Sequence, residues 1–267
     1  MYATLADGFT QRVVLAGQAN NGQWGPTGLA FTTDGALLVA NFHDGHVYRV
    51  APDGRPDPEP FIRDLGTVGL ATLPGGHVLA TGMGAQAALE LDPGARAICR
   101  RYPCDLGRPV GAALDPRGGR VLVTLLREHA LAWLDLASGA WILAHAGPPL
   151  DRPDGLAFDA DGNAFVGCVG SNQVVRLAAD GSIGAAADVP GEPDGIAVAG
   201  PSGPLQGAVF VSCHDGALHR LDHDGRAWRA RLVASGGTRG DHMVIGPDRR
   251  LYLTQTDEIL QIGPPSF

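Results

Sequence analysis

Three aspartates stand at equivalent places in a sequence motif that recurs along the chain. Asp154 and Asp194 precede the segments Gly-Leu-Ala-Phe and Gly-Ile-Ala-Val, and Asp241 precedes a divergent copy that begins with His242. Carboxylates gathered at one place repel one another, so they stay together by sharing a proton, by accepting hydrogen bonds or by binding a cation. Asp154, Asp194 and Asp241 are therefore candidate ligands of one divalent cation (calcium, magnesium or zinc). Asp194, Asp241 and His242 are candidate catalytic acids and bases.

Each of these residues also has a structural interpretation. An aspartate before a glycine can cap backbone amides where the chain enters a strand. His242 is unusual because it replaces a glycine of the motif, and both a structural and a functional role stay open for it.

The motif occurs six times and defines the fold. Its central positions are Gly28, Gly69, Gly111, Gly155, Gly195 and His242, which are 41, 42, 44, 40 and 47 residues apart. A period in the forties that consists of strands and turns is typical of propeller blades. The sequence therefore predicts an all-β protein, a six-bladed β-propeller with four-stranded blades, as a single domain over residues 1–267.

The two ends of the chain are expected to complete one blade together. The last repeat has room for three strands, near 241–246, 250–255 and 258–263, and the N-terminal segment 9–15 is expected to supply the fourth. This pairing closes the ring and removes two exposed strand edges. The first blade is expected to contain strands near 27–32, 36–41, 46–51 and 60–64.

The loops that enter the innermost strands and those that leave the second strands meet on one face, where a ligand pocket is expected. Apolar residues there would form a wall, and polar ones from the second strands would complete it. Cys213 is interpreted as a buried small hydrophobe or a nucleophile, and His214 as part of a solvated turn or a ligand contact. The candidate substrate-binding residues are Trp24, Asn41, Val68, Met83, Val110, Leu125, Cys213 and His214.

Composition excludes several classes of partner. The formal net charge is −8 and no run of lysine or arginine occurs, which argues against nucleic-acid binding. No apolar run approaches the roughly 18 residues of a membrane span, and no signal peptide is visible.

The four cysteines lack metal-ligand spacing. We expect a cytoplasmic protein with reduced thiols and a small-molecule substrate; the sequence does not indicate an oligomeric state.

The segment from Pro153 to Cys168, followed by Val174-Val-Arg-Leu, resembles the fourth repeat of the SMP-30/gluconolactonase (regucalcin-like) family of six-bladed propellers. The resemblance extends best over residues 150–215. It implies a divalent cation at the channel mouth that holds a lactone carbonyl while an activated water attacks. In that family a glutamate, two asparagines and the aspartate of Pro-Asp-Gly typically bind the cation. Only the aspartate carries over, as Asp154, because the other positions fall on Trp24, Val68 and Val110.

Three functions follow from these observations. The first is hydrolysis of a lactone or related ester, with a cation moved to Asp154, Asp194 and Asp241. The second is a metal-independent lyase, isomerase or cyclase that acts on a hydrophobic molecule through its aspartates and His242. The third is a non-catalytic propeller that binds a partner through its loops. Lactone hydrolysis is the primary hypothesis.

Overall fold

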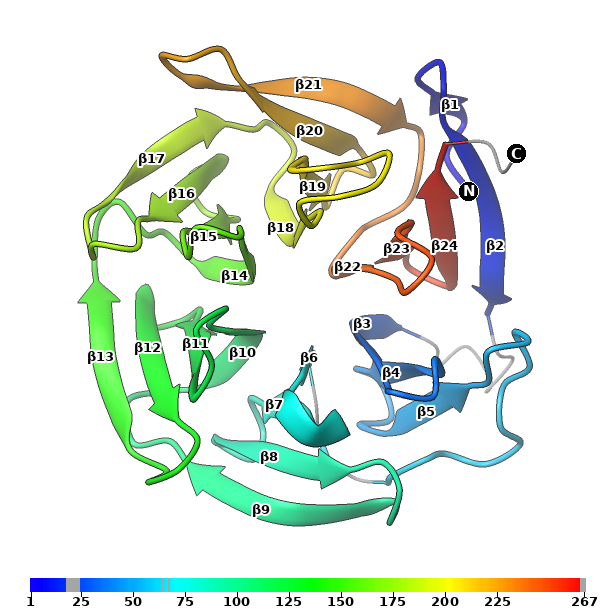
Figure 1. Ribbon diagram of the computed structural model, residues 1–267, viewed down its shortest axis with the longest axis vertical. Coiled ribbons are helices and arrows are strands. Elements are labelled where there is room, and N and C mark those ends of the chain that lie inside the picture. The colour runs from blue at the N-terminus through cyan, green and yellow to red at the C-terminus, as the bar shows by residue number, and fades with distance from the viewer. Residues whose placement is uncertain (18–24, 64, 67, 265–267) are drawn as a thin grey trace.

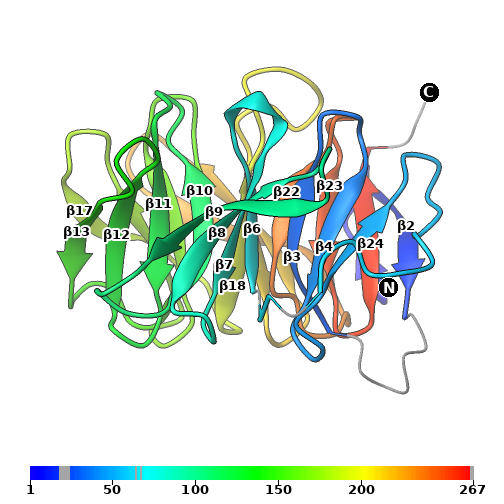
Figure 2. The ribbon, with the colours of Figure 1, turned by 90° about the horizontal axis from the view of Figure 1, so that it is seen from below.

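The strands form six antiparallel sheets arranged radially around a channel (Figure 1). The computed structural model describes residues 1–17, 25–63, 65–66 and 68–264. The described residues contain one short 3₁₀ turn, η1 (Pro74–Gly76), and otherwise strands, turns and loops. Figure 2 shows the sheets from the side, packed next to one another around the ring. The predicted six-bladed β-propeller is confirmed.

Each blade begins with its innermost strand. Blade one contains β3 (Pro26–Phe31), β4 (Leu37–Asn41) and β5 (Val47–Val50). Blade two contains β6 (Gly69–Thr72), β7 (Val78–Gly82), β8 (Ala87–Asp92) and β9 (Ala97–Pro103). Blade three contains β10 (Pro109–Leu114), β11 (Arg120–Leu125), β12 (Ala130–Asp135) and β13 (Trp141–Ala146).

The second half of the ring repeats this order. Blade four contains β14 (Pro153–Phe158), β15 (Ala164–Cys168), β16 (Gln173–Leu177) and β17 (Ile183–Asp188). Blade five contains β18 (Pro193–Val198), β19 (Val209–Cys213), β20 (Leu218–His223) and β21 (Trp228–Ser235). Blade six contains β22 (Met243–Ile245), β23 (Leu251–Thr254) and β24 (Glu258–Gly263).

The N-terminal segment closes the ring, as the sequence predicts. Strand β2 (Thr10–Ala16) pairs antiparallel with β24, with Arg12 opposite Gln261, and becomes the outer strand of blade six. A short strand that the sequence did not suggest, β1 (Thr4–Leu5), pairs with β21 at the outer edge of blade five. The N-terminus therefore joins two blades, and both outer edges are covered (Figure 1).

The predicted fourth strand of blade one, near 60–64, pairs with β5 among the residues described there, but only through an isolated antiparallel bridge. Sheet pairing at this edge is reduced to isolated bridges from Val47 to Ile62 and from Val50 to Pro56. The stretch between the end of β5 and Ile62 contains four prolines, at positions 52, 56, 58 and 60. Proline lacks the backbone N–H that a sheet ladder needs, so a continuous strand cannot form here.

Apolar side chains pack mainly between neighbouring blades. One buried cluster joins Leu122 and Leu131 of blade three to Val166 and Val175 of blade four, and similar clusters occupy the other interfaces. The core is thus distributed around the ring, and its stability depends on how closely adjacent sheets approach.

The repeat glycines set that approach. A Cβ atom at Gly28 would lie 2.7 Å from the carbonyl oxygen of Val68, the residue before the next repeat glycine. At Gly111 and Gly155 it would overlap the carbonyl oxygens of Asp154 and Asp194. Each innermost strand therefore lies against the backbone of the next blade, at a distance that only glycine permits.

We predict that Gly111→Ala lowers the free energy of unfolding by about 3 kcal/mol, because the added methyl group must push two blades apart. Gly184→Ala is the matched control, since a Cβ at Gly184 in outer strand β17 meets no atom within 4 Å. Urea unfolding followed by tryptophan fluorescence measures both variants. Equal stability of the two would contradict the account of the blade interface.

Candidate functional site

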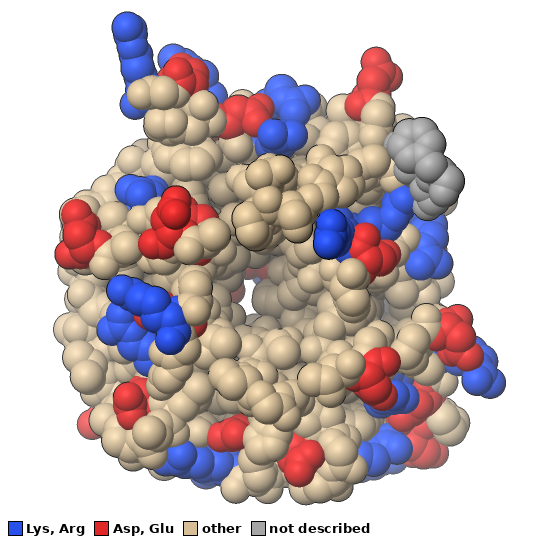
Figure 3. Space-filling model, viewed as in Figure 1, with Lys and Arg blue, Asp and Glu red and all other residues tan. Residues whose placement is uncertain are grey.

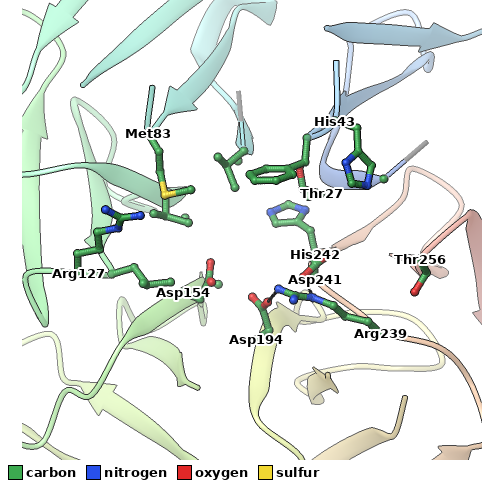
Figure 4. A pocket seen from close by; sticks show the side chains of 18 residues that line it. Thr27, His43, Met83, Arg127, Asp154, Asp194, Arg239, Asp241, His242 and Thr256 are labelled. Atoms are coloured by element: carbon green, nitrogen blue, oxygen red, sulfur yellow. Dashed lines mark hydrogen bonds and ion pairs between the residues drawn. The ribbon is translucent and has the colours of Figure 1, made fainter. Parts of the chain in front are cut away.

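A cavity of about 410 Å³ lies at the end of the channel where the chain enters the innermost strands. Figure 3 shows the opposite face, with the other opening of the channel at its centre. Figure 4 shows the cavity itself, with side chains from all six blades converging on it. Among the residues described, its lining comprises Gly25, Thr27, Phe42, His43, Val68, Gly69, Met83, Val110, Gly111, Leu126, Arg127, Asp154, Gly155, Asp194, Arg239, Asp241, His242 and Thr256.

One side of this pocket is formed by a hydrogen-bonded network of polar side chains from blades five and six. Asp194 is 2% exposed, and its Oδ2 lies 2.7 Å from Nε2 of His214. The other ring nitrogen of His214, Nδ1, lies 3.0 Å from Oε2 of Glu192. Nε of Arg239 donates a hydrogen bond of 2.7 Å to Oδ1 of Asp241. The network therefore contains three carboxylates, an imidazole and a guanidinium, of which Asp194, Asp241 and Arg239 line the pocket.

Two of the carboxyl groups hold protons more tightly than usual. Burial, together with the charge of Asp241, raises the pKa of Asp154 to about 7. Burial and the charges of Asp154 and Asp241 raise the pKa of Asp194 well above its usual range. Arg239 lowers both pKa values, but burial and like-charge repulsion outweigh its effect. Near neutral pH, at least one proton is thus shared among these aspartates.

His242 has a structural role that explains how it can replace a glycine. Its Nδ1 accepts a hydrogen bond of 3.1 Å from the backbone N–H of Leu29, so the imidazole fills the interface between blades six and one. Burial lowers the pKa of His242 to about 4, so the ring is neutral at pH 7. Because Nδ1 accepts a hydrogen bond, the proton of the neutral ring is on Nε2. The side chain is suited to donate a hydrogen bond, and not to act as a base.

The opposite side of the pocket is apolar. Val68, Val110 and Met83, all predicted from the sequence, line it together with Phe42 and Leu126. A ligand there would meet hydrocarbon on one side and charged groups on the other, which is the usual arrangement of a small-molecule site.

Four predicted pocket residues, Asn41, Leu125, Cys213 and His214, do not line the cavity. Asn41 is buried, and its side chain accepts a hydrogen bond of 2.8 Å from the backbone N–H of Gly25. Leu125 packs in a buried cluster with Cys104, and the next residue faces the pocket. Cys213 is buried, and burial raises the pKa of its thiol, as expected for a small hydrophobe. Trp24 lies outside the described residues.

Several pocket residues were missed by the sequence analysis. Arg239 lies two residues before Asp241, in a loop outside the repeat pattern, and Arg127 lies in the turn after β11. His214 was predicted as a direct contact, but among the described residues it stands behind the pocket and supports Asp194. A basic residue next to a repeated acidic position is the signal that could have identified Arg239.

The arrangement of possible metal ligands also differs from the predicted triad. Ligand atoms of Asp194, His214 and Asp241 lie within 4.8 Å of one another, whereas Asp154 is not in this group. In the described part of the chain, a second group of this kind, His77, Glu90 and Cys99, lies in blade two, away from the pocket.

No protein-family model and no curated protein matches the chain by sequence. Solved structures with the same fold include a gluconolactonase from Xanthomonas campestris, at 19% identity and a TM-score of 0.79 over 98% of this chain and 92% of the other. Regucalcin from Agrobacterium tumefaciens, a calcium-binding protein, has 15% identity and a TM-score of 0.71 over 96% and 94%. Virginiamycin B lyase from Staphylococcus aureus has 14% identity and a TM-score of 0.71 over 96% and 100%.

Fold and pocket together define a six-bladed propeller with a cavity at one channel mouth that is charged on one side and apolar on the other. Structures similar to this chain include gluconolactonase and regucalcin members of the SMP-30 family, and also lyases. At these identities the similarity establishes the fold alone. Among the described residues, no helix is long and apolar enough to span a membrane.

We predict that Asp154→Asn stabilises the protein at high pH. The pKa of Asp154 is about 7 in the folded protein, against 3.8 in the unfolded chain. The protonated carboxyl contributes to the stability of the folded protein, and this contribution is fully present below pH 3.8 and is lost as the pH rises through 7. At pH 8 the ionised, buried carboxylate therefore lowers the free energy of unfolding. The variant should melt about 2–4 °C higher than the wild type at pH 8, equivalent to about 1 kcal/mol. At pH 5 the difference should shrink.

The control for this measurement is Asp161→Asn, in the exposed hairpin of blade four, which should leave the melting temperature unchanged at both pH values. A destabilised D154N variant at pH 8 would contradict the assignment of a raised pKa to Asp154.

Proposed function

We propose that the protein is an enzyme that opens a lactone or related ester by hydrolysis in the channel-mouth pocket. The observation that carries this proposal is the cluster of Asp154, Asp194 and Asp241, in which burial and neighbouring negative charge raise the pKa values of the first two. Arg239 donates a hydrogen bond to Asp241. Ester hydrolysis needs a group that takes and returns one proton and a positive group that stabilises a developing oxyanion. The polar side of the pocket offers both.

Asp154 is the proposed proton carrier. Its pKa of about 7 means that it is part ionised at neutral pH, which is the best compromise between accepting and donating a proton. As the base it removes a proton from water, and hydroxide adds to the ester carbonyl carbon. The ring C–O bond then breaks, and the proton passes to the ring oxygen. The product is a hydroxy acid.

Arg239 and His242 are the proposed oxyanion stabilisers. Arg239 is held by Asp241, and its Nη2 lies 3.9 Å from Oδ2 of Asp194, so the guanidinium is fixed at the polar side of the pocket. The Nε2–H of His242 supplies a neutral donor in the middle of the pocket (Figure 4). Donors fixed in advance cost no reorganisation during the reaction.

The calcium site implied by the family resemblance does not fit this pocket. Calcium takes six to eight oxygen ligands, and Val68 and Val110 offer none from their side chains. The remaining group of Asp194, His214 and Asp241 is already engaged, because His214 is hydrogen-bonded to Asp194 and Arg239 to Asp241. The guanidinium supplies a positive charge where the cation would lie. The proposed mechanism therefore relies on side chains alone.

A second candidate reaction is elimination, which would open the same ester without water. The proton-sharing aspartates suit proton abstraction from carbon as well as from water, and the neutral His242 again supplies a hydrogen-bond donor. One of the similar structures is a catalytically inactive His-to-Ala variant of virginiamycin B lyase from Staphylococcus aureus, with quinupristin. The two reactions differ in the source of the oxygen atoms in the product.

We predict that opening of a lactone from a screening panel in H₂¹⁸O gives a hydroxy acid that contains one ¹⁸O atom per turnover. Mass spectrometry of the product measures the label. An unsaturated acid without label would overturn hydrolysis and establish elimination. Failure of the enzyme to open any lactone on the panel would contradict the proposed function as a whole.

We further predict that Asp154→Asn lowers kcat by about 10²- to 10⁴-fold, the usual cost of losing a general acid or base. Asp161→Asn should retain full activity. Incubation with EDTA should leave the wild-type rate unchanged, because Arg239 takes the place of a cation. Loss of activity with EDTA, restored by calcium, magnesium or zinc, would contradict the side-chain mechanism.

A further inference from the structure

Arg127 lines the pocket but has no hydrogen-bond or ion-pair partner within the described part of the chain. It lies in the turn between β11 and β12 and is exposed. The other arginine of the pocket, Arg239, is held by Asp241. Figure 4 shows Arg127 beside Met83, on the far side of Asp154 from Arg239. Two guanidinium groups thus face the cavity from different sides, and only one of them is neutralised.

The surroundings of Arg127 favour an anionic partner. The exposed side chain of Arg127 lies next to the apolar wall of the pocket, which contains Met83, Leu126 and Val110. Arginine is weakly hydrated and presents its N–H groups as a planar fork that matches a carboxylate. A carboxylate bound there would form paired, charge-assisted hydrogen bonds without first breaking an existing ion pair.

The polar side of the pocket would fix the direction of such a ligand. Asp154, Asp194 and Asp241 repel an anion, whereas Arg127 attracts it from the opposite side. The ester group would then be directed towards the aspartates, and the apolar body of the molecule would lie along the wall that contains Val68 and Val110.

We propose that the substrate is an anionic lactone, with a carboxylate that binds Arg127 and an apolar spacer between that carboxylate and the ester. This inference rests on the proposed function for the ester group. Arg127 itself is a specificity residue, because it contacts the substrate far from the bond that breaks.

The test uses γ-butyrolactones that carry a carboxylate at the end of a γ-alkyl chain of one to four methylenes, each paired with its neutral carboxamide. For the best-fitting chain length, the wild type should favour the carboxylate in kcat/KM by about 10- to 100-fold, the usual value of a hydrogen bond to a charged group. Arg127→Ala should abolish this preference, because it should lower kcat/KM for the carboxylate far more than for the carboxamide. Arg127→Lys should retain part of it, because it keeps the charge and loses the fork.

Arg108→Ala is the matched control. Arg108 is an exposed arginine in the loop that enters blade three, and it is not among the described lining residues. It should leave the carboxylate preference unchanged. Equal use of carboxylate and carboxamide by the wild type, or an equal loss on both substrates in R127A, would overturn the proposal.

A binding measurement separates this inference from the proposed function. Cyclopentanones with the same side chains keep the ring carbonyl but contain no ester, so calorimetry reports binding without turnover. Tighter binding of the carboxylate than of the carboxamide, lost in R127A, supports the anion site even if no lactone is opened. Lactone opening without such a preference would support the proposed function and contradict the anion site.

Discussion

The structure depends on backbone packing between neighbouring blades. Five of the six innermost strands carry a glycine whose missing side chain leaves room for the carbonyl oxygen of the next blade. Hydroxyl groups reinforce this contact: Thr124 accepts a hydrogen bond from the N–H of Gly111 and donates one to the carbonyl of Asp154, both 2.7 Å long. The residues that precede the glycines are thereby held by their backbone, and their side chains point into the channel mouth. Fold and pocket thus have the same origin.

The sixth interface differs, and the difference affects the chemistry of the pocket. At His242 an imidazole replaces the glycine and bonds to the N–H of Leu29, so blades six and one are joined by a side chain. The same residue lines the pocket and the apolar cavity at the other end of the channel. Its burial keeps it neutral beside three aspartates, which leaves Arg239 to balance their charge. The aspartates therefore share protons near pH 7.

The repeat spacing was sufficient to predict the propeller, the closing N-terminal strand and the face that holds the pocket. It also identified Asp154, Asp194 and Asp241, because they occupy repeated positions. Sequence reasoning failed where the direction of a side chain determines whether the residue lines the pocket. Leu125 and Leu126 point to opposite sides of a strand end, and only Leu126 faces the cavity. Arg239 lies outside the repeat pattern, so periodicity could not reveal it. The prolines near Ile62 were visible in the sequence, but the repeat pattern was given more weight.

The central claim is that the aspartates of the pocket share a proton near neutral pH. It is tested most directly by ¹³C NMR of protein labelled at the aspartate carboxyl carbons, titrated from pH 3 to 9, with Asp154→Asn used to assign one resonance. The account predicts that the Asp154 resonance titrates near pH 7 and that its removal shifts the titration of Asp194. Titration of every aspartate below pH 5 would contradict it, since the pocket would then hold only ionised carboxylates.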